Sequence, residues 1–331
     1  MARRSDRARL LVQDHRVAQA RVGARAAALV LRSWHRLVRP AAPAATAGPW
    51  LTEALEVVRD HRAQSERLGV AFLRYHRALE TGFTLPPLEP SRSRTVSFRE
   101  LRQDYAAAAG ESDRRDLDDN VLVPVDLDIE WPDLDNESMD AAARTSLWVT
   151  GPVHAEQRLA RAEEDRTRGR LDEAGFLSEL DGLMRDAGTT GAGAADREVL
   201  RGGRTLIARS GRADRRVIGW ARVTDVDPCA WCAMLASRGA VYKTRDSAGL
   251  AGGPPVNLDD LTKYHDLCHC QLTPVYSRDS WLPDGSDAWR DLWKEATDGL
   301  SGPEATRAFN RAVAARRRHV RRRALPTARR S

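Results

Sequence analysis

The sequence is poor in lysine, in cysteine and in long apolar runs. Three of its 53 basic residues are lysines, so arginine carries nearly all of the positive charge. The longest apolar runs, such as AAALVL and CAWCAMLA, fall short of the roughly 18–20 residues that a membrane-spanning helix needs. The basic N-terminus reaches Asp14 before the apolar core of a signal peptide could form. We therefore expect a protein of cytoplasmic origin, without a membrane partner, in which thiols stay reduced.

The positive charge is concentrated at the C-terminus. The net charge is +6, yet residues 305–331 contain ten arginines and no acid, while the remaining chain has 43 basic and 47 acidic residues. A solvated helix end explains many charge runs, but ten uncompensated arginines exceed what solubility requires. We predict that this tail binds DNA phosphates without reading base sequence. The arginines expected to make these contacts are Arg316, Arg317, Arg318, Arg321, Arg322 and Arg323.

The spacing of apolar residues predicts a mainly α fold with a small α+β metal-binding module near the C-terminus. Pro40 closes a first long helix, and a second runs from about Thr52 to Gly82. We expect their apolar faces to pack on each other as a helical hairpin, or on a partner. The two stripes are Leu11, His15, Ala18, Val22, Ala26 and Leu29, and then Leu55, Val58, Leu68, Phe72, Tyr75 and Leu79.

The chain is long enough for roughly two domains, and its composition divides it into four regions. These are an N-terminal helical module with a linker (1–97), a helical middle with an acidic extended segment (98–213), a Cys/His zinc-binding-like module (214–280), and a C-terminal helix with an arginine-rich tail (281–331). The patch GTTGAGAAD is expected to end one helix and begin the next. Helices are predicted over 98–109, 137–148, 153–168, 172–187, 197–210 and 302–323, strands over 215–225 and 271–276, and a strand, a loop and a helical turn over 240–263.

All four cysteines lie in two short stretches, DPCAWC and YHDLCHC. A tetrahedral zinc ion takes four nitrogen or sulfur ligands, and two close pairs joined by a turn or hairpin can supply them. The stretches offer six donors for four places, so the ligands are either all four cysteines, or Cys229, Cys232, His265 and one of Cys268 and Cys270. The six donors are Cys229, Cys232, His265, Cys268, His269 and Cys270.

Two other interpretations of these cysteines stay open. They could be unrelated thiols, which their complete segregation into two groups disfavours, or they could form disulfides under oxidising conditions. A redox C-x-x-C of the thioredoxin type is disfavoured because no βαβ pattern surrounds it. A structural zinc is favoured over a catalytic one, since a surplus of donors indicates a closed site without an open coordination position.

The same residues resemble a known family. The stretch GWARVTDVDPCAWCAMLASRGAVYK, followed by YHDLCHCQLTPVY, is similar to the C-terminal signature of the MuF-like phage minor head proteins, in the branch found in actinobacterial phages. The resemblance covers about residues 194–277 and places Cys229, Cys232, His265, Cys268 and Cys270 at the signature positions. It implies a minor capsid protein of the virion, active in head assembly at the capsid interior, with the portal and other capsid proteins as partners.

Two further functions compete with this one. A capsid maturation protease could use Ser237 or Cys229 as nucleophile, His265 as base and the adjacent Asp266, but no G-x-S-x-G elbow is present. A zinc-finger DNA-binding protein would need base-reading side chains beside the metal, and AMLASRGA offers only Ser237 and Arg238. We lean towards a structural protein without a small-molecule substrate.

Overall fold

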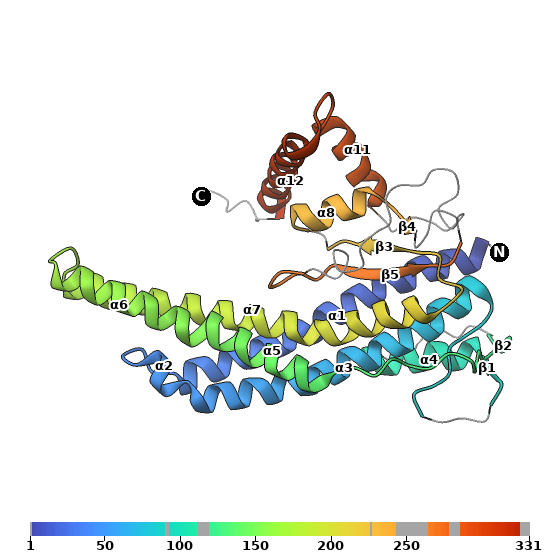
Figure 1. The fold of residues 1–331 in the computed structure, drawn as a ribbon, viewed down its shortest axis with the longest axis horizontal. Coiled ribbons are helices and arrows are strands. Elements are labelled where there is room, and N and C mark those ends of the chain that lie inside the picture. Colours follow the sequence, from blue (N-terminus) through green and yellow to red (C-terminus); the bar gives the residue numbers. More distant parts are fainter. Residues whose placement is uncertain are drawn as a thin grey trace, which may run out of the picture.

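The computed structural model describes residues 2–89, 93–111, 119–225, 227–242, 264–277 and 285–324. Its fold is mainly α with two small antiparallel sheets, as predicted. Long helices lie side by side along the longest axis, and a smaller C-terminal unit of helices and strands covers one flank (Figure 1). Within the described residues, no helix is both long and apolar enough to cross a bilayer.

The first two long helices form the predicted hairpin. They are α1 (Ala2–Leu37) and α3 (Gly48–Thr81), joined through the short α2 (Pro43–Thr46), and they pack on each other. Every apolar position predicted for α3 is buried, and Gly82 ends this helix in the left-handed conformation. In α1 the predicted apolar stripe is correct except at its last position. With 3.6 residues per turn, Val30 rather than Leu29 faces the core. Leu29 is 38% exposed and Val30 is fully buried.

One continuous helix, α7 (Glu173–Ala213), replaces the two helices expected over 172–187 and 197–210. The glycine-rich patch does not break it. Instead, Gly188 leaves room for Trp34, whose nearest atom would lie 2.6 Å from a Cβ at that position, and Gly191 faces Trp50. Burial of these tryptophans against the helix backbone outweighs the roughly 1 kcal/mol that each glycine costs a helix. The predicted break was therefore wrong.

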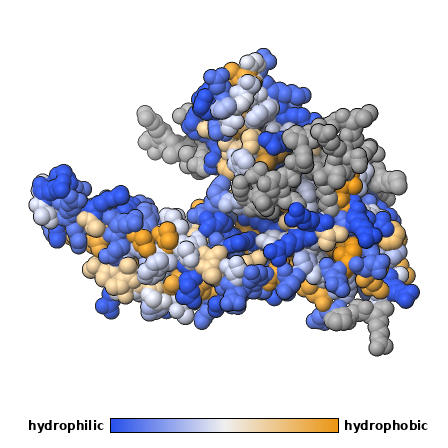
Figure 2. All heavy atoms as spheres, viewed as in Figure 1, coloured by the Kyte–Doolittle hydropathy of each residue, from blue (hydrophilic) through white to orange (hydrophobic). Residues whose placement is uncertain are grey.

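A two-helix arm projects beyond the hairpin. The chain enters it through α5 (Asn136–Trp148) and a π-helical turn, η1 (Val149–Val153), and continues as α6 (His154–Thr167), which packs against the first half of α7 (Figure 1). Pro152 lies inside the π-helical turn, and a proline lacks the N–H that a regular helix would use there. Hydrophilic residues cover the far end of this arm (Figure 2).

A small sheet of two strands lies at the opposite end of the bundle. Strand β1 (Thr95–Ser97) pairs antiparallel with β2 (Leu122–Pro124), and Thr84 bridges to Val125 beside them. The sequence predicted a linker where β1 lies and an acidic extended segment where β2 lies, because strands of three residues are too short to show an alternation. Directly after β1, α4 (Phe98–Ala109) spans the predicted residues and begins with a capping box.

The C-terminal unit is built on a second sheet with strand order β4-β3-β5. Its strands are β3 (Gly219–Val223), β4 (Val241–Tyr242) and β5 (Gln271–Val275), all paired antiparallel. Three helices, α8 (Ala230–Ser237), α11 (Ser286–Ala296) and α12 (Gly302–Ala324), share a core around Phe309 and Val313. The loop and helical turn predicted over 243–263 lie outside the described residues.

A buried arginine ties the bundle to the C-terminal unit. The guanidinium of Arg77 on α3 is fully buried and donates to Asp214, at the end of α7, over 2.7 Å and to Asp126 over 2.7 Å. Two carboxylates on one buried guanidinium satisfy its charge, whereas loss of the arginine would remove the cation that pairs with buried Asp214. The chain enters β3 a few residues after this anchor, so the position of the second sheet depends on it.

Candidate metal centre

The first cysteine pair lies at the start of α8. Cys229 is the N-cap residue, and its sulfur accepts a hydrogen bond from the Cys232 backbone N–H over 3.4 Å. This sulfur takes the place of the oxygen atom that usually caps a helix. The positive end of the helix dipole lies beside the sulfur and favours a negative charge on it. Cys232 follows on the first turn and is 1% exposed. A two-residue spacer across a helix N-terminus therefore directs both thiols to the same side.

The second pair lies directly before β5, in a stretch without regular secondary structure. The sulfurs of Cys268 and Cys270 lie within 4.8 Å of each other, whereas the side chain of His269 between them contacts two carboxylates. The imidazole of His269 lies 3.2 Å from Asp196 Oδ1 and 3.4 Å from Asp225 Oδ2. Hydrogen bonds to these two carboxylates raise the pKa of His269 to about 9. His269 is therefore an ion-pair link to α7 and leaves the donor set considered from sequence.

Three buried thiols converge at the centre. The sulfurs of Cys232, Cys268 and Cys270 all lie within 4.8 Å of one another, and those of Cys232 and Cys268 are 3.6 Å apart. With zinc–sulfur bonds of about 2.3 Å, two ligands of one tetrahedral ion lie roughly 3.8 Å apart. The four cysteines are free thiols. The three buried cysteines lie close enough to hold a metal ion.

Cys229 and His265 lie at the edge of this cluster. Cys229 is half-buried and packs against the three buried cysteines. Hydrogen bonds from Cys232, and then from His265, lower the pKa of Cys229 to about 5. His265 is exposed, and its Nδ1 lies 2.7 Å from the Asp266 carbonyl oxygen. Burial opposes its charge, but hydrogen bonds to Asp266 and Cys229 raise the pKa of His265. Either residue is in place to be a fourth ligand.

Two buried arginines enclose the cluster, and sequence reasoning missed both. Arg204 on α7 and Arg222 on β3 are 4% and 1% exposed, and both guanidinium groups lie over the Tyr264 ring, at 3.7 Å and 4.3 Å from its centroid. Arg204 also donates to the carbonyl oxygens of Cys268 and Cys270, the latter over 2.9 Å. It therefore holds the backbone on both sides of His269. In the sequence, alternation placed Arg222 in a strand, but burial of an arginine there cannot be read from alternation.

Of the two nucleophiles considered for a protease, Cys229 interacts with His265, whereas Ser237 does not. Ser237 is buried in the last turn of α8, and its hydroxyl donates to the Met234 carbonyl oxygen over 2.7 Å. In the described part of the chain, no histidine forms a hydrogen bond with this serine. A serine nucleophile needs such a base to remove its proton. The arrangement around Ser237 therefore caps a helix end and does not activate a hydroxyl.

The arginines of α12 divide between the body of the protein and the solvent. Arg317 pairs with Asp227 over 2.6 Å, and the Arg316 guanidinium lies 4.7 Å from the centroid of the Trp289 ring. Arg318 is exposed, as are Arg307 and Arg311, which the sequence prediction left out. The side chains of Arg321, Arg322 and Arg323 lie outside the described residues. The DNA contacts assigned to this helix stay a prediction.

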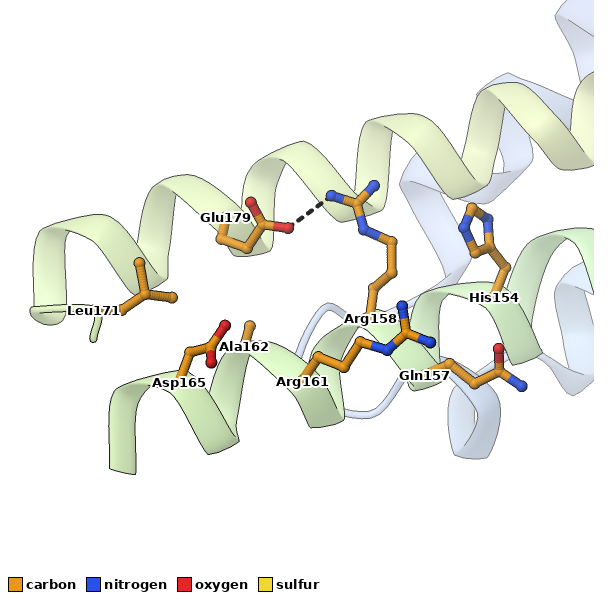
Figure 3. A pocket seen from close by; sticks show the side chains of 8 residues that line it. All are labelled: His154, Gln157, Arg158, Arg161, Ala162, Asp165, Leu171 and Glu179. Carbon is orange, nitrogen blue, oxygen red and sulfur yellow. Dashed lines mark hydrogen bonds and ion pairs between the residues drawn. The ribbon is translucent and has the colours of Figure 1, made fainter. Parts of the chain in front are cut away.

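A hollow of about 420 Å³ lies on the arm, between α6 and the first turns of α7 (Figure 3). Its lining is charged and largely self-neutralised. Arg158 is turned toward Glu179, with 2.6 Å between nitrogen and oxygen, and Asp165 accepts from Arg170 over 2.7 Å. Pairs of this kind on a surface contribute little energy and present no unpaired group to a ligand. The cysteine cluster is therefore the stronger candidate site.

Comparison with known proteins identifies relatives of this chain. Residues 152–296 match the family described as VG15 protein. The Gene 15 protein of Mycobacterium phage D29 is 32% identical over 136 residues. The Gene 15 protein of Mycobacterium phage L5 is 29% identical over 224 residues. Over these residues the chain is similar to phage gene 15 proteins.

These matches cover only part of this chain and part of each gene 15 protein. The D29 match covers 33% of this chain and 50% of the D29 protein, and the L5 match covers 52% of this chain and 72% of the L5 protein. The chain thus spans half the length of the first gene 15 relative. The VG15 region runs from η1 to the end of α11 and includes all four cysteines. No solved structure matched the chain.

Proposed function

We propose that this chain is a phage minor head protein that acts in head assembly beside the portal, inside the capsid. In this role the helical bundle and its arm bind portal and capsid proteins, a structural zinc ion closes the C-terminal unit, and α12 contacts packaged DNA. The observation that carries the proposal is the convergence of Cys229, Cys232, Cys268 and Cys270, the residues through which the sequence resembles MuF-like proteins, at one place in the fold. Similarity to phage gene 15 proteins supports it.

The cluster suits a structural role better than a catalytic one. Cys232, Cys268 and Cys270 are all buried, and Arg204 and Tyr264 lie against them, so a bound ion would have no open face for a substrate. A metal at this point would join the start of α8 to the segment before β5. Zinc would supply a redox-inactive cross-link here, and the backbone held by Arg204 would keep its sulfur ligands oriented.

The exposed face of α12 supports the proposed contact with DNA. Arg307, Arg311 and Arg318 are spaced by four and seven residues, which places them on one stripe of a helix, opposite Phe309 and Val313 in the core. At 1.5 Å per residue the stripe spans about 17 Å, the length of several phosphates along a strand. Guanidinium groups in such a row neutralise phosphates and carry no base-edge specificity.

Head assembly tests the proposal directly. The chain is produced together with the portal and major capsid proteins of its phage, and assembled heads are separated by sedimentation. We expect the chain in the head fraction, cross-linked to the portal when a short bifunctional reagent is added. A chain that stays in the soluble fraction while portal-containing heads form would overturn the proposal.

DNA binding is tested separately, by measuring affinity for random-sequence duplexes between 50 and 200 mM salt. Replacing Arg307, Arg311 and Arg318 with glutamine should lower the slope of log K against log salt by about 2–3, since each phosphate contact contributes about 0.9. An unchanged slope would rule out this face. A matched control replaces three exposed arginines of the bundle: Arg25, Arg32 and Arg144.

A further inference from the structure

The charge around the cysteine cluster distinguishes between the two ligand sets that the sequence allowed. Arg204 and Arg222 are permanently charged groups, because a guanidinium does not lose its proton in a protein. Both are nearly inaccessible to water, and both lie within 4.3 Å of the centroid of the same tyrosine ring. Buried charges require compensation close by.

The two ligand sets carry different charges. A divalent ion bound by four thiolates has a net charge of −2, whereas three thiolates and a neutral imidazole leave −1. Two guanidinium groups against the cluster balance the first set. Arg204 further donates to the carbonyls of Cys268 and Cys270, so its charge is fixed on the side of the second cysteine pair.

The geometry of the first cysteine pair favours the same four-thiolate ligand set as the charge does. Cys229 caps the helix on which Cys232 is buried, and it already packs against the other three cysteines. His265, in contrast, is exposed, and its Nδ1 is engaged at the Asp266 carbonyl. An imidazole in this position can donate a hydrogen bond to the Cys229 sulfur from outside, which is the usual place of a group that orients a metal ligand.

We infer that the cluster binds one divalent, thiophilic metal ion through four thiolates, those of Cys229, Cys232, Cys268 and Cys270, with Arg204 and Arg222 balancing its charge. His265 lies outside the ligand set and contacts Cys229. The inference rests on the proposed zinc clasp, by which we mean the structural zinc ion that joins the start of α8 to the segment before β5. It adds the ligands of this ion and the two arginines that position them. Zinc and cobalt(II) both satisfy the chemistry of such a site, and cobalt(II) reports its ligands by absorption.

Cobalt(II) substitution of the full chain tests the ligand set. Thiolate-to-cobalt charge-transfer absorption scales with the number of bound sulfurs, so Cys229→Ser should lower its intensity by about one quarter. His265→Ala should leave the charge-transfer and d–d bands unchanged, and because His265 is exposed this variant is expected to fold. Altered bands in His265→Ala with unchanged intensity in Cys229→Ser would overturn the assignment while leaving the clasp in place. An unmodified chain that binds neither zinc nor cobalt(II) would overturn both.

The role of the arginines is tested by zinc affinity, measured in competition with a chelator. Loss of a group that supports metal ligands commonly costs about 10–100-fold in affinity, so we expect a decrease in that range for Arg204→Met and for Arg222→Met. Arg204→Lys keeps the charge and should lose less. Arg62→Met removes a buried arginine of the bundle, 3% exposed and paired with Asp140, and serves as control without an effect on zinc affinity. Equal affinity in all four variants would refute the charge balance.

Discussion

Two histidines in the bundle make its stability dependent on pH. His15 on α1 and His76 on α3 are each 1% exposed, and Phe72 lies between them, with ring centroids 4.0 Å from His15 and 5.1 Å from His76. Among the described residues, neither imidazole has a hydrogen-bond partner. Burial lowers the pKa of His15 and of His76 from 6.5 to about 3, and for His15 the nearby His76 adds to the effect.

The sign and size of the effect follow from linkage. A histidine whose pKa is depressed by folding binds its proton more tightly in the unfolded chain, so its contribution is complete above pH 6.5 and is lost as the pH falls. Each pH unit below 6.5 costs about 1.4 kcal/mol per histidine, until the pKa of the folded state is reached. At pH 5 the pair therefore removes about 4 kcal/mol, a large share of the 5–15 kcal/mol that holds a typical domain.

Urea denaturation at pH 7.5, 6.5, 5.5 and 5.0 measures this loss. His15→Leu combined with His76→Leu should be no less stable than the unmodified chain at pH 5 and should retain about 4 kcal/mol more between pH 7.5 and 5. The comparison between variants cancels the contributions of carboxylates and thiols, which both proteins share. His35→Leu removes an exposed histidine of α1 and is the control. Parallel pH profiles for the double variant and the unmodified chain would refute the reasoning.

Three other predictions address packing, the buried ion pair and the metal. Gly188→Ala should lower the free energy of unfolding by about 1–2 kcal/mol despite better helix propensity, because its Cβ would lie 2.6 Å from Trp34. Gly182→Ala, with nothing within 4 Å, should instead raise it by up to about 1 kcal/mol. Arg77→Met should cost about 3–5 kcal/mol in thermal or urea unfolding, since the buried carboxylate of Asp214 would lose the guanidinium that balances its charge. A chelator added to zinc-loaded protein should increase hydrogen exchange in α8 but not in α1 and α3, and equal exchange in α8 would contradict the clasp.

The periodicity of the sequence was sufficient to predict most of the helices and strands of the fold. Helices α3, α4, α5, α6 and α12 and strands β3 and β5 lie within a few residues of their predicted bounds. Amphipathic spacing and capping residues act locally, so they are visible without the partner that a helix packs against. The segregation of the cysteines into two stretches likewise indicated one cluster, since a structural zinc ion takes four ligands that two close pairs can supply.

Tertiary packing decided what local signals could not. The glycines of α7 predict a break when taken alone, and their compatibility with a helix depends on Trp34 and Trp50, which come from distant parts of the chain. The sequence offered His265 and His269 as donors and placed only His265 in a ligand set, but it could not show that His269 contacts Asp196 and Asp225. In the sequence, nothing distinguishes Arg204 and Arg222 from the rest of the 50 arginines, although both are buried in the structure. Their role depends on burial, which is a property of the assembled core and is written in no single stretch of sequence.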